Sequence, residues 1–220
     1  MPIKPPPDRL YGRVKAKALR PRQAWLLAEF LPHLAWPDVP FAPGLRELWL
    51  EVGFGGGEHA LALSQANPQV GLIAAEVFES GVCSLLSRLA PEGKPPHMPG
   101  NLRLFTDDAR PLLRGMGDGA LAKLFLMFPD PWPKARHAKR RFVHPELVAA
   151  AARVLRAGGE WRIASDDPTY QDWTDAVLAG QSAFAVTRAS KRPEGWPATR
   201  YEAKALAAGR APVWWSLIRR

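Results

Sequence analysis

The sequence predicts an α/β fold built on a parallel, doubly wound sheet. Short apolar runs alternate with helical stretches along most of the chain, and the stretches between the runs are long enough to form crossover helices. One run leads into a glycine-rich turn and then into a helix, which is the order found at nucleotide-binding turns. Strands are expected over residues 48–52, 72–75, 102–106, 123–128 and 160–164, and two late strands over 184–188 and 213–218.

A helix is expected ahead of the sheet, and a basic arm ahead of that helix. Apolar residues recur at helical spacing over 23–34, and Pro37, Pro40 and Pro43 then end the pattern. Residues 1–22 carry seven basic side chains against one acid, together with five prolines, which favours a mobile arm that contacts phosphates over an ordinary frayed terminus. Because 220 residues suit one medium-sized core, we expect a single domain over 23–220.

The charge balance points to a polyanionic partner. Lys and Arg total 30 against 21 acidic residues, which gives a formal net charge of +9. A basic surface that serves only solubility is the alternative, because charge alone does not identify a partner.

Composition also disfavours several other classes of protein. Cys83 is the single cysteine and the five histidines lack the short spacing of metal ligands, so we expect neither a disulfide nor a metal. No apolar run is long enough to span a membrane, and the prolines and charges at the start do not form a signal peptide. The expectation is a cytoplasmic protein without membrane contact. A monomer is the expected state, although no pattern reports it directly.

The glycine-rich turn after the first strand carries the clearest chemistry. In EVGFGGGEH, residues 51–59, Gly53 and Gly55 allow the backbone to approach a ligand. Position 58 is Glu where a dinucleotide fingerprint needs glycine, which argues against NAD. Glu51 would repel a pyrophosphate but attracts an ammonium group, and S-adenosyl-L-methionine carries an ammonium. A tight turn without a ligand is the alternative.

Acids also follow the next two strands. Glu76 stands 23 residues after Gly53, near the spacing at which a carboxylate accepts hydrogen bonds from ribose hydroxyls in doubly wound folds. Asp108, in the sequence DDA after the third strand, is expected beside the adenine, with helix capping as the alternative. The position of these acids after successive strands favours a shared cofactor site.

The fourth strand ends in the proline-rich stretch FPDPWPK, residues 128–134. Its prolines fix the backbone and leave Asp130 and Trp132 at the ligand-binding edge of the sheet. A base could stack on Trp132 or Phe128, with Asp130 accepting from guanine or contacting the cofactor near its methyl group. A stiff turn around a core tryptophan is the alternative.

Polar and basic residues continue beyond this stretch. Residues 134–141 hold five basic side chains and a histidine, which predict phosphate binding over an ordinary solvated face. Of Asp166 and Asp167 after the fifth strand, one could cap the next helix, and Asp166 is the expected site residue. The stretch RPEGWPATRYE, residues 192–202, offers a hydroxyl, an aromatic ring and a carboxylate, but its residues alone leave its role open.

Taken together, EVGFGGGEH, Glu76, DDA, FPDPWPKARHAKRR and RPEGWPATRYE resemble the successive motifs of the tRNA (guanine-N7)-methyltransferase family over nearly the whole chain. The segment FPDPWPKARHAKRR is the most specific of them. The resemblance implies a class I S-adenosyl-L-methionine-dependent methyltransferase fold, Rossmann-like, with seven strands of which one is antiparallel. It also implies methylation of N7 of the guanine at position 46 in the tRNA variable loop.

The resemblance further implies roles for individual residues. It matches the cofactor-binding acids to Glu51, Glu76, Asp108 and Asp130, of which Asp130 is also the expected catalytic residue. It matches the substrate contacts to Lys134, Asp166, Thr199, Arg200, Tyr201 and Glu202, and the RNA-contacting segment to Arg136, His137, Lys139, Arg140 and Arg141.

The chain departs from the family pattern near its carboxyl end. Family members usually carry Asp-Trp where this chain has Asp166-Asp167, and Arg-Gly and Gly-His where Lys204-Ala205 and Gly209-Arg210 stand. These departures concern substrate recognition and leave the cofactor-side acids intact. Methylation of an exocyclic amino group of RNA and tRNA binding without catalysis are the alternative functions.

Overall fold

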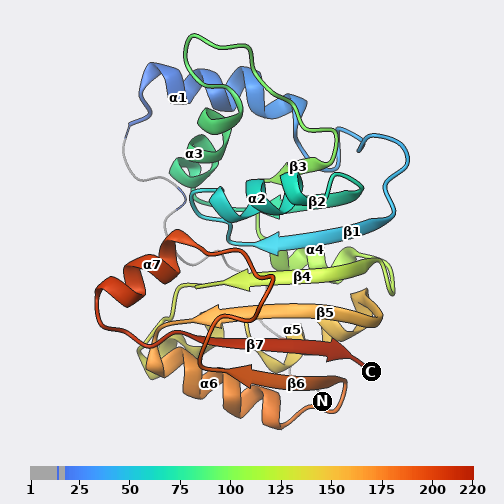
Figure 1. Cartoon of the computed structure of the whole chain (residues 1–220), viewed down its shortest axis with the longest axis vertical. Coiled ribbons are helices and arrows are strands. Elements are labelled where there is room, and N and C mark those ends of the chain that lie inside the picture. The colour runs from blue at the N-terminus through green and yellow to red at the C-terminus, as the bar shows by residue number, and fades with distance from the viewer. Residues whose placement is uncertain (1–13, 15–17) are drawn as a thin grey trace.

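The sheet of the computed structural model has seven strands in the order β3-β2-β1-β4-β5-β7-β6. They are β1 Glu47–Val52, β2 Val70–Ala75, β3 Leu102–Phe105, β4 Leu121–Met127, β5 Leu155–Ser165, β6 Phe184–Ala189 and β7 Val213–Arg219. Strand β7 is antiparallel to both of its neighbours, and β1 to β5 pair in parallel, as the arrowheads in Figure 1 show. Every expected strand is present, and the predicted fold class is confirmed.

The structure describes residue 14 and residues 18–220. Most of the predicted basic arm, residues 1–22, therefore lies outside the described residues. The helix expected over 23–34 begins two residues earlier, because Pro21 occupies its first turn, where no backbone N–H is needed. It comprises α1 Pro21–Trp25, a π-helical turn η1 Leu26–Phe30 and a 3-10 turn η2 Leu31–His33. Pro32 cannot donate to an earlier carbonyl, which is consistent with the irregular end of this helix.

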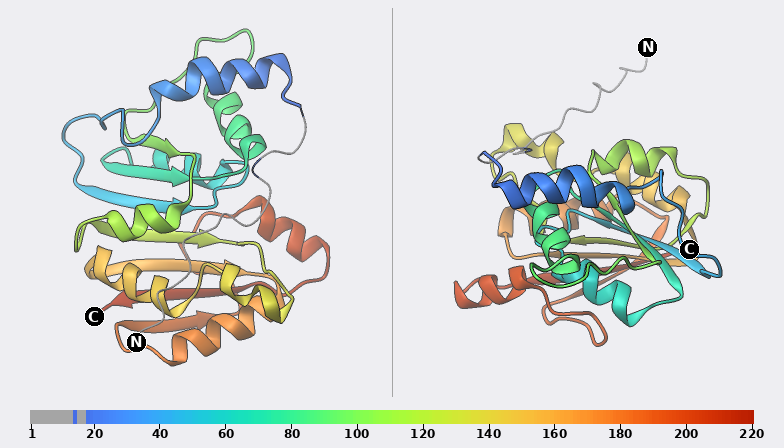
Figure 2. Two further views of the ribbon diagram at one scale, coloured as in Figure 1. Left: turned by 180° about the vertical axis from the view of Figure 1, so that it is seen from behind. Right: turned by 90° about the horizontal axis from the view of Figure 1, so that it is seen from above.

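Helices cover both faces of the sheet. The remaining helices are α2 Glu58–Ala66, α3 Glu79–Leu89, α4 Ala109–Gly115, the 3-10 helix η3 Ala135–Arg140, α5 Pro145–Val154, α6 Pro168–Ala179 and α7 Arg200–Ala207. One face packs against α4, α5 and α6, which lie in front of the strands in the rear view of Figure 2. The other face packs against η1, α2 and α3.

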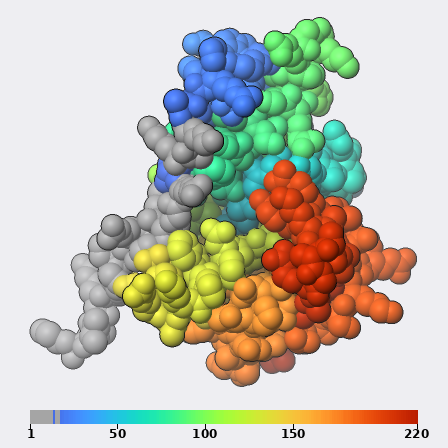
Figure 3. All heavy atoms as spheres, turned by 90° about the vertical axis from the view of Figure 1, so that its left-hand side faces the viewer, coloured from blue at the N-terminus to red at the C-terminus, as the bar shows by residue number. Residues whose placement is uncertain are grey.

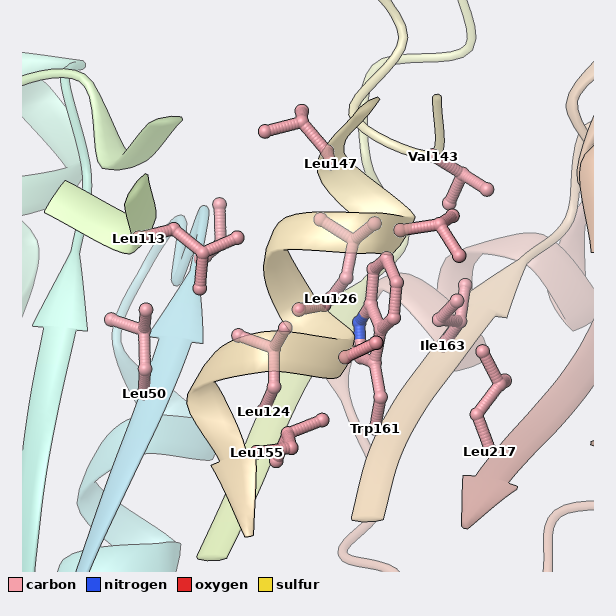
Figure 4. Packing of buried hydrophobic residues seen from close by; sticks show 14 of the residues in the cluster. Leu50, Leu113, Leu124, Leu126, Val143, Leu147, Leu155, Trp161, Ile163 and Leu217 are labelled. Carbon is pink, nitrogen blue, oxygen red and sulfur yellow. The ribbon is translucent and has the colours of Figure 1, made fainter. Parts of the chain in front are cut away.

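The core beneath α5 shows how this packing holds the central strands in place. Trp161 on β5 is fully buried, and its ring lies beside Leu126 of β4 and Ile163 (Figure 4). Each such buried side chain contributes about 1.5–3 kcal/mol relative to its exposed state. On the opposite face, Leu26 and Phe30 of η1 belong to the second buried cluster, so the first helix is part of the same domain core.

The carboxyl ends of β1 to β5 share one edge of the sheet, on the left in Figure 1. Helix α7 lies at this edge too, and Figure 3 faces it, with the segment after β4 in yellow and α7 in red. The segments that were expected to carry chemistry therefore meet on one side of the molecule. Among the described residues, no helix is both long enough and apolar enough to span a bilayer.

Candidate active site

A cavity of about 650 Å³ opens at the carboxyl edge of the sheet. That volume lies within the range of small-molecule sites. Its walls come from the ends of β1, β2, β3 and β4 and from α7, and the predicted site residues among them are Gly53, Gly55, Glu76, Asp108, Asp130, Arg140 and Tyr201. Trp132, expected to stack on a base, lines it as well. Phe78, Arg110 and Phe142 also line the cavity, although no motif pointed to them.

The glycine turn after β1 needs its glycines for conformation and for close approach. Gly53 and Gly55 have φ angles of 74° and 58°, in the left-handed region that favours glycine. A Cβ atom at Gly55 would lie 2.9 Å from the hydroxyl oxygen of Tyr201 on α7. Any side chain at position 55 would therefore displace the ring that closes this end of the cavity.

The Glu76 carboxylate is fixed in place by backbone donors. The Gly55 amide donates to its Oε2 at 2.9 Å, and the Phe78 amide donates to its Oε1 at 2.9 Å. Burial raises the pKa of Glu76, the negative charge of Asp130 raises it further, and the backbone donors oppose the rise. Each oxygen keeps a second lone pair for a ligand hydroxyl, which fits the predicted contact with ribose.

Glu51 is almost completely buried. The residue is 1% exposed, and its Oε1 lies 3.0 Å from Nδ1 of His59. No donor among the described residues reaches Oε2. Glu51 lines a second cavity of about 10 Å³, and Gly53 and Tyr201 line both cavities. That small space holds about one water. A buried carboxylate oxygen in need of a donor suits the ammonium of S-adenosyl-L-methionine, so the residues fit this cofactor.

Asp108 has two roles. Its side chain accepts from the Arg110 amide at 3.0 Å and caps α4, and it pairs with the Arg110 guanidinium at 2.6 Å. It also lines the large cavity, so the expected site position and the alternative of helix capping both hold.

The loop of residues 128–134 enters the cavity in a strained conformation. Phe128 and Trp132 have φ angles of 54° and 46°, which cost non-glycine residues about 1–3 kcal/mol each. Phe128, Asp130 and Trp132 all line the cavity. The Arg140 guanidinium lies over the Trp132 ring at 4.7 Å from its centroid, and the His137 ring meets it edge-on. Strain of this size at a ligand-facing loop points to a functional constraint.

The basic run of residues 134–141 divides into exposed and buried members. Lys134, Arg136 and Lys139 are exposed, whereas Arg141 is 5% exposed. Partial desolvation and the charges of Arg140, Arg136 and Lys134 lower the pKa of His137. The run therefore does not present all of its charge to solvent.

The acids after β5 take separate partners. Asp167 accepts from the Tyr170 amide at 3.0 Å and caps α6, which leaves Asp166 as the residue without that capping role. Asp166 pairs through Oδ2 with Nε of Arg210 at 2.8 Å. Arg210 is one of the departures from the family pattern, so the departure contacts an expected substrate residue directly.

The stretch before and within α7 is largely self-contained. Thr199 caps α7 by accepting from the Glu202 amide at 3.0 Å, and Glu202 accepts from Nε of Arg192 at 3.1 Å. Thr199 and Glu202 are each 8% exposed, while Tyr201 reaches the cavity. Nη1 of Arg200 lies 3.9 Å from Oε1 of Glu58. The Thr-x-x-Glu spacing is that of a capping box, but only the half made by Thr199 forms, since the Glu202 side chain pairs with Arg192.

Comparison with known proteins places the chain in a family. A family model described as "Putative methyltransferase" matches residues 46–214. The tRNA (guanine-N(7)-)-methyltransferase of Granulibacter bethesdensis is 60% identical over 224 residues, covering 100% of this chain and 99% of the relative. The protein of the same name from Paramagnetospirillum magneticum is 45% identical and covers 96% and 93%.

Solved structures support the fold. A 16S rRNA methyltransferase superposes with a TM-score of 0.60 at 16% identity, covering 81% of this chain and 94% of that one. An rRNA methylase from Streptococcus thermophilus gives 0.54 at 15% identity and covers 93% and 99%. At these identities the likeness concerns the fold alone.

The family and the fold agree with the motifs that carried the resemblance and with the cavity that those motifs build. S-adenosyl-L-methionine, predicted from the glycine turn and Glu51, is the cofactor that this methyltransferase family implies. The chain belongs to the tRNA (guanine-N(7)-)-methyltransferase family.

Proposed function

We propose that the protein transfers the methyl group of S-adenosyl-L-methionine to N7 of the guanine at position 46 in the tRNA variable loop. One observation carries the proposal: Asp130 and Trp132 line the same cavity as the glycine turn and Glu76. A base-stacking ring and an acid thus share a space with cofactor-binding groups. The names of the relatives support tRNA and guanine N7 as substrate and target atom.

The cofactor half of the site would hold S-adenosyl-L-methionine by its polar ends. Glu76 accepts from the ribose hydroxyls, Oε2 of Glu51 accepts from the ammonium group, and Asp108 lies beside the adenine. The bound cofactor supplies an electrophilic methyl group on its sulfonium sulfur.

The substrate half would position the guanine. The base stacks on Trp132 or Phe128, and Asp130 accepts from its ring N–H and amino group. Guanine N7 already presents a lone pair, so no general base has to remove a proton before attack. Holding N7 about 3 Å from the methyl carbon supplies the main rate gain, and the Asp130 carboxylate stabilises the positive charge that appears on the methylated base.

The basic residues beside the loop would bind the tRNA backbone. Lys134, Arg136 and Lys139 are exposed and follow the cavity-lining residues directly, with His137 and Arg140 between them. Tyr201 reaches the cavity from the segment 199–202, and in this proposal Asp166 and the other residues of that segment contact the substrate outside the cavity. Because phosphate contacts release counterions, tRNA affinity should fall steeply with salt.

The test is transfer of labelled methyl groups to unmodified tRNA by the wild type and by Asp130→Ala, followed by nucleoside analysis. Label in 7-methylguanosine with the wild type, and its loss with Asp130→Ala, is the expected result. A matched tRNA with adenine at position 46 should accept no label if the position is correct.

Other outcomes would select the alternative functions. Label on an exocyclic amino group would identify the other enzyme class. Tight tRNA binding without cofactor binding in calorimetry would indicate a tRNA-binding protein without catalysis.

A further inference from the structure

Arg141 is the one buried member of the basic run of residues 134–141. Its Nε donates to the carbonyl oxygen of Pro131 at 3.2 Å, and its Nη2 donates to the carbonyl oxygen of Trp132 at 3.0 Å. Its guanidinium also lies over the ring of Trp173, 4.9 Å from the ring centroid. The charge of Arg141 is thus directed at the active-site loop and away from solvent.

The geometry of these contacts suits arginine alone. A guanidinium presents its donors in a rigid planar fork, whereas the lysine ammonium is a point charge that cannot hold two successive carbonyls in the same way. Those carbonyls bracket the strained backbone of Trp132, whose φ angle is 46°. Such a conformation persists only when its surroundings fix it.

Helix α6 fixes the position of Arg141 in turn. The Val143 amide donates to the Tyr170 hydroxyl at 3.3 Å, and the Trp173 indole donates to the Val143 carbonyl. Tyr170 is fully buried. A continuous set of contacts therefore runs from α6 through residues 141–143 to the loop that carries Asp130 and Trp132.

We infer that Arg141 is a positioning residue that holds the loop of residues 128–134 against the cavity, and that it does not contact tRNA phosphates. The expectation that the whole segment from Arg136 to Arg141 contacts RNA thus applies to its exposed members. The expected effect on kcat rests on the proposed function, whereas the effect on the position of the loop does not.

The kinetic experiment compares Arg141→Lys and Arg141→Gln with Arg136→Gln, an exposed arginine of the same run. Arg141→Lys keeps the charge and loses the fork, and should lower kcat by about 10- to 100-fold, because small misplacements of reacting groups are costly. Neither Arg141 variant should change the dependence of tRNA affinity on salt. Arg136→Gln should lower the slope of log K against log salt by about 1.

A second measurement does not depend on activity. Hydrogen exchange of the peptide covering residues 128–143, in which the amides of Phe128, His137, Arg141 and Val143 are hydrogen-bonded, should be faster in Arg141→Lys than in the wild type and unchanged in Arg136→Gln. Trp173→Phe removes the indole donor but keeps a ring, and should give the same change at smaller size. This variant also answers the question if the Arg141 variants fail to fold in a thermal unfolding control.

The outcomes separate the inference from the proposed function. A salt slope lowered by about 1 in Arg141→Gln, with kcat retained, would make Arg141 a phosphate contact and overturn the inference. Unchanged exchange of the loop in both Arg141→Lys and Trp173→Phe would overturn it as well. Wild-type protein without tRNA methylation would refute the proposed function, while loop exchange would still decide the role of Arg141.

Discussion

The cofactor half and the substrate half that we propose for the site are built in different ways. In the cofactor half, Gly53, Gly55 and Glu76 line the cavity as the sequence predicts. In the substrate half, predicted contacts such as Thr199 and Asp166 are engaged with other protein groups. The sheet alone brings the glycine turn and Glu76 together, whereas the orientation of the Asp166 and Thr199 side chains also depends on their partners.

Sheet register accounts for the first half. Strands β1, β2 and β3 are adjacent and parallel, so their carboxyl ends must lie side by side. In the second half, Asp166 pairs with Arg210 and Glu202 with Arg192, contacts that join residues from different segments. Substitutions in the cofactor half should therefore act mainly on cofactor affinity, and those in the substrate half should act on stability or on KM for tRNA.

Glu76→Ala should weaken cofactor binding most strongly. The substitution removes the acceptor for the Gly55 and Phe78 amides as well as the predicted ribose contact. Hydrogen bonds to a charged group contribute about 1.5–3 kcal/mol each, so the affinity for S-adenosylhomocysteine should fall by about 100-fold or more in calorimetry. Glu76→Gln, which keeps one acceptor oxygen, should fall less. A parallel loss of tRNA affinity would break the division into two halves.

Gly55→Ala should have the next largest effect. Alanine at a φ of 58° is strained, and its Cβ would lie 2.9 Å from the Tyr201 hydroxyl. Alanine should relieve the cost of the left-handed conformation, about 1–2 kcal/mol, by leaving that conformation in the free protein, and its restoration on binding should lower cofactor affinity by about tenfold. Adding Tyr201→Ala should remove the clash but not the conformational cost. Full recovery in the double variant would show that the clash was the whole effect.

The cofactor half of the site could be predicted from the sequence more fully than the substrate half. Every strand could be predicted because apolar runs bounded by turns report burial, and Glu76 because its spacing after Gly53 reports the next strand end. The presence of one antiparallel strand came from the family resemblance, since apolar periodicity carries no direction, and the structure identifies that strand as β7. Nothing in the spacing of the basic run distinguishes Arg141 from Arg136, because the partners of Arg141 depend on the folded loop.

The pH dependence of cofactor binding should reveal the burial of Glu76. Its pKa is raised above the ordinary value of 4.5, so it gains a proton at a pH where an exposed glutamate is still charged. Cofactor affinity, which uses the carboxylate, should fall by about tenfold per pH unit below the raised pKa.

The stability of the unliganded protein should respond with the opposite sign. The contribution of Glu76 to the free energy of unfolding is fully present below the pKa of the unfolded state and is lost as pH rises through the pKa of the folded state.

Calorimetry with S-adenosylhomocysteine from about pH 5 to about pH 8 measures the pH dependence of binding. Glu76→Gln has no proton to gain and should give a flatter profile; an equally steep profile in this variant would assign the proton to another group.

In the substrate half, Thr199→Val should destabilise α7. The hydroxyl accepts from the Glu202 amide, and loss of such a cap costs about 1 kcal/mol, which lowers Tm by about 2–4 °C at this chain length. Thr199→Ser keeps the acceptor and should retain Tm. A raised KM for tRNA with Tm unchanged would instead identify Thr199 as a direct substrate contact.

The smallest expected effect is that of Arg210→Ala. The side chain of Arg210 is 52% exposed and that of Asp166 19%, so the pair is screened by solvent and contributes about 0–1 kcal/mol to stability. In the proposed function, where Asp166 contacts the substrate, the ion pair holds the Asp166 carboxylate in one orientation through Oδ2. We therefore expect KM for tRNA to rise by about two- to threefold and cofactor affinity to stay constant.

A salt titration and the variant Arg210→His are the controls for Arg210→Ala. Because screening shortens the range of an exposed ion pair, the difference in KM between wild type and Arg210→Ala should shrink as salt is raised. Arg210→His, which restores the residue usual in the family, should recover the wild-type KM if the donor to Asp166 is what matters. A KM unaffected by Arg210→Ala at low salt would mean that Arg210 does not orient Asp166. Asp166 would then be positioned by the end of β5, just as Glu76 is positioned by the end of β2.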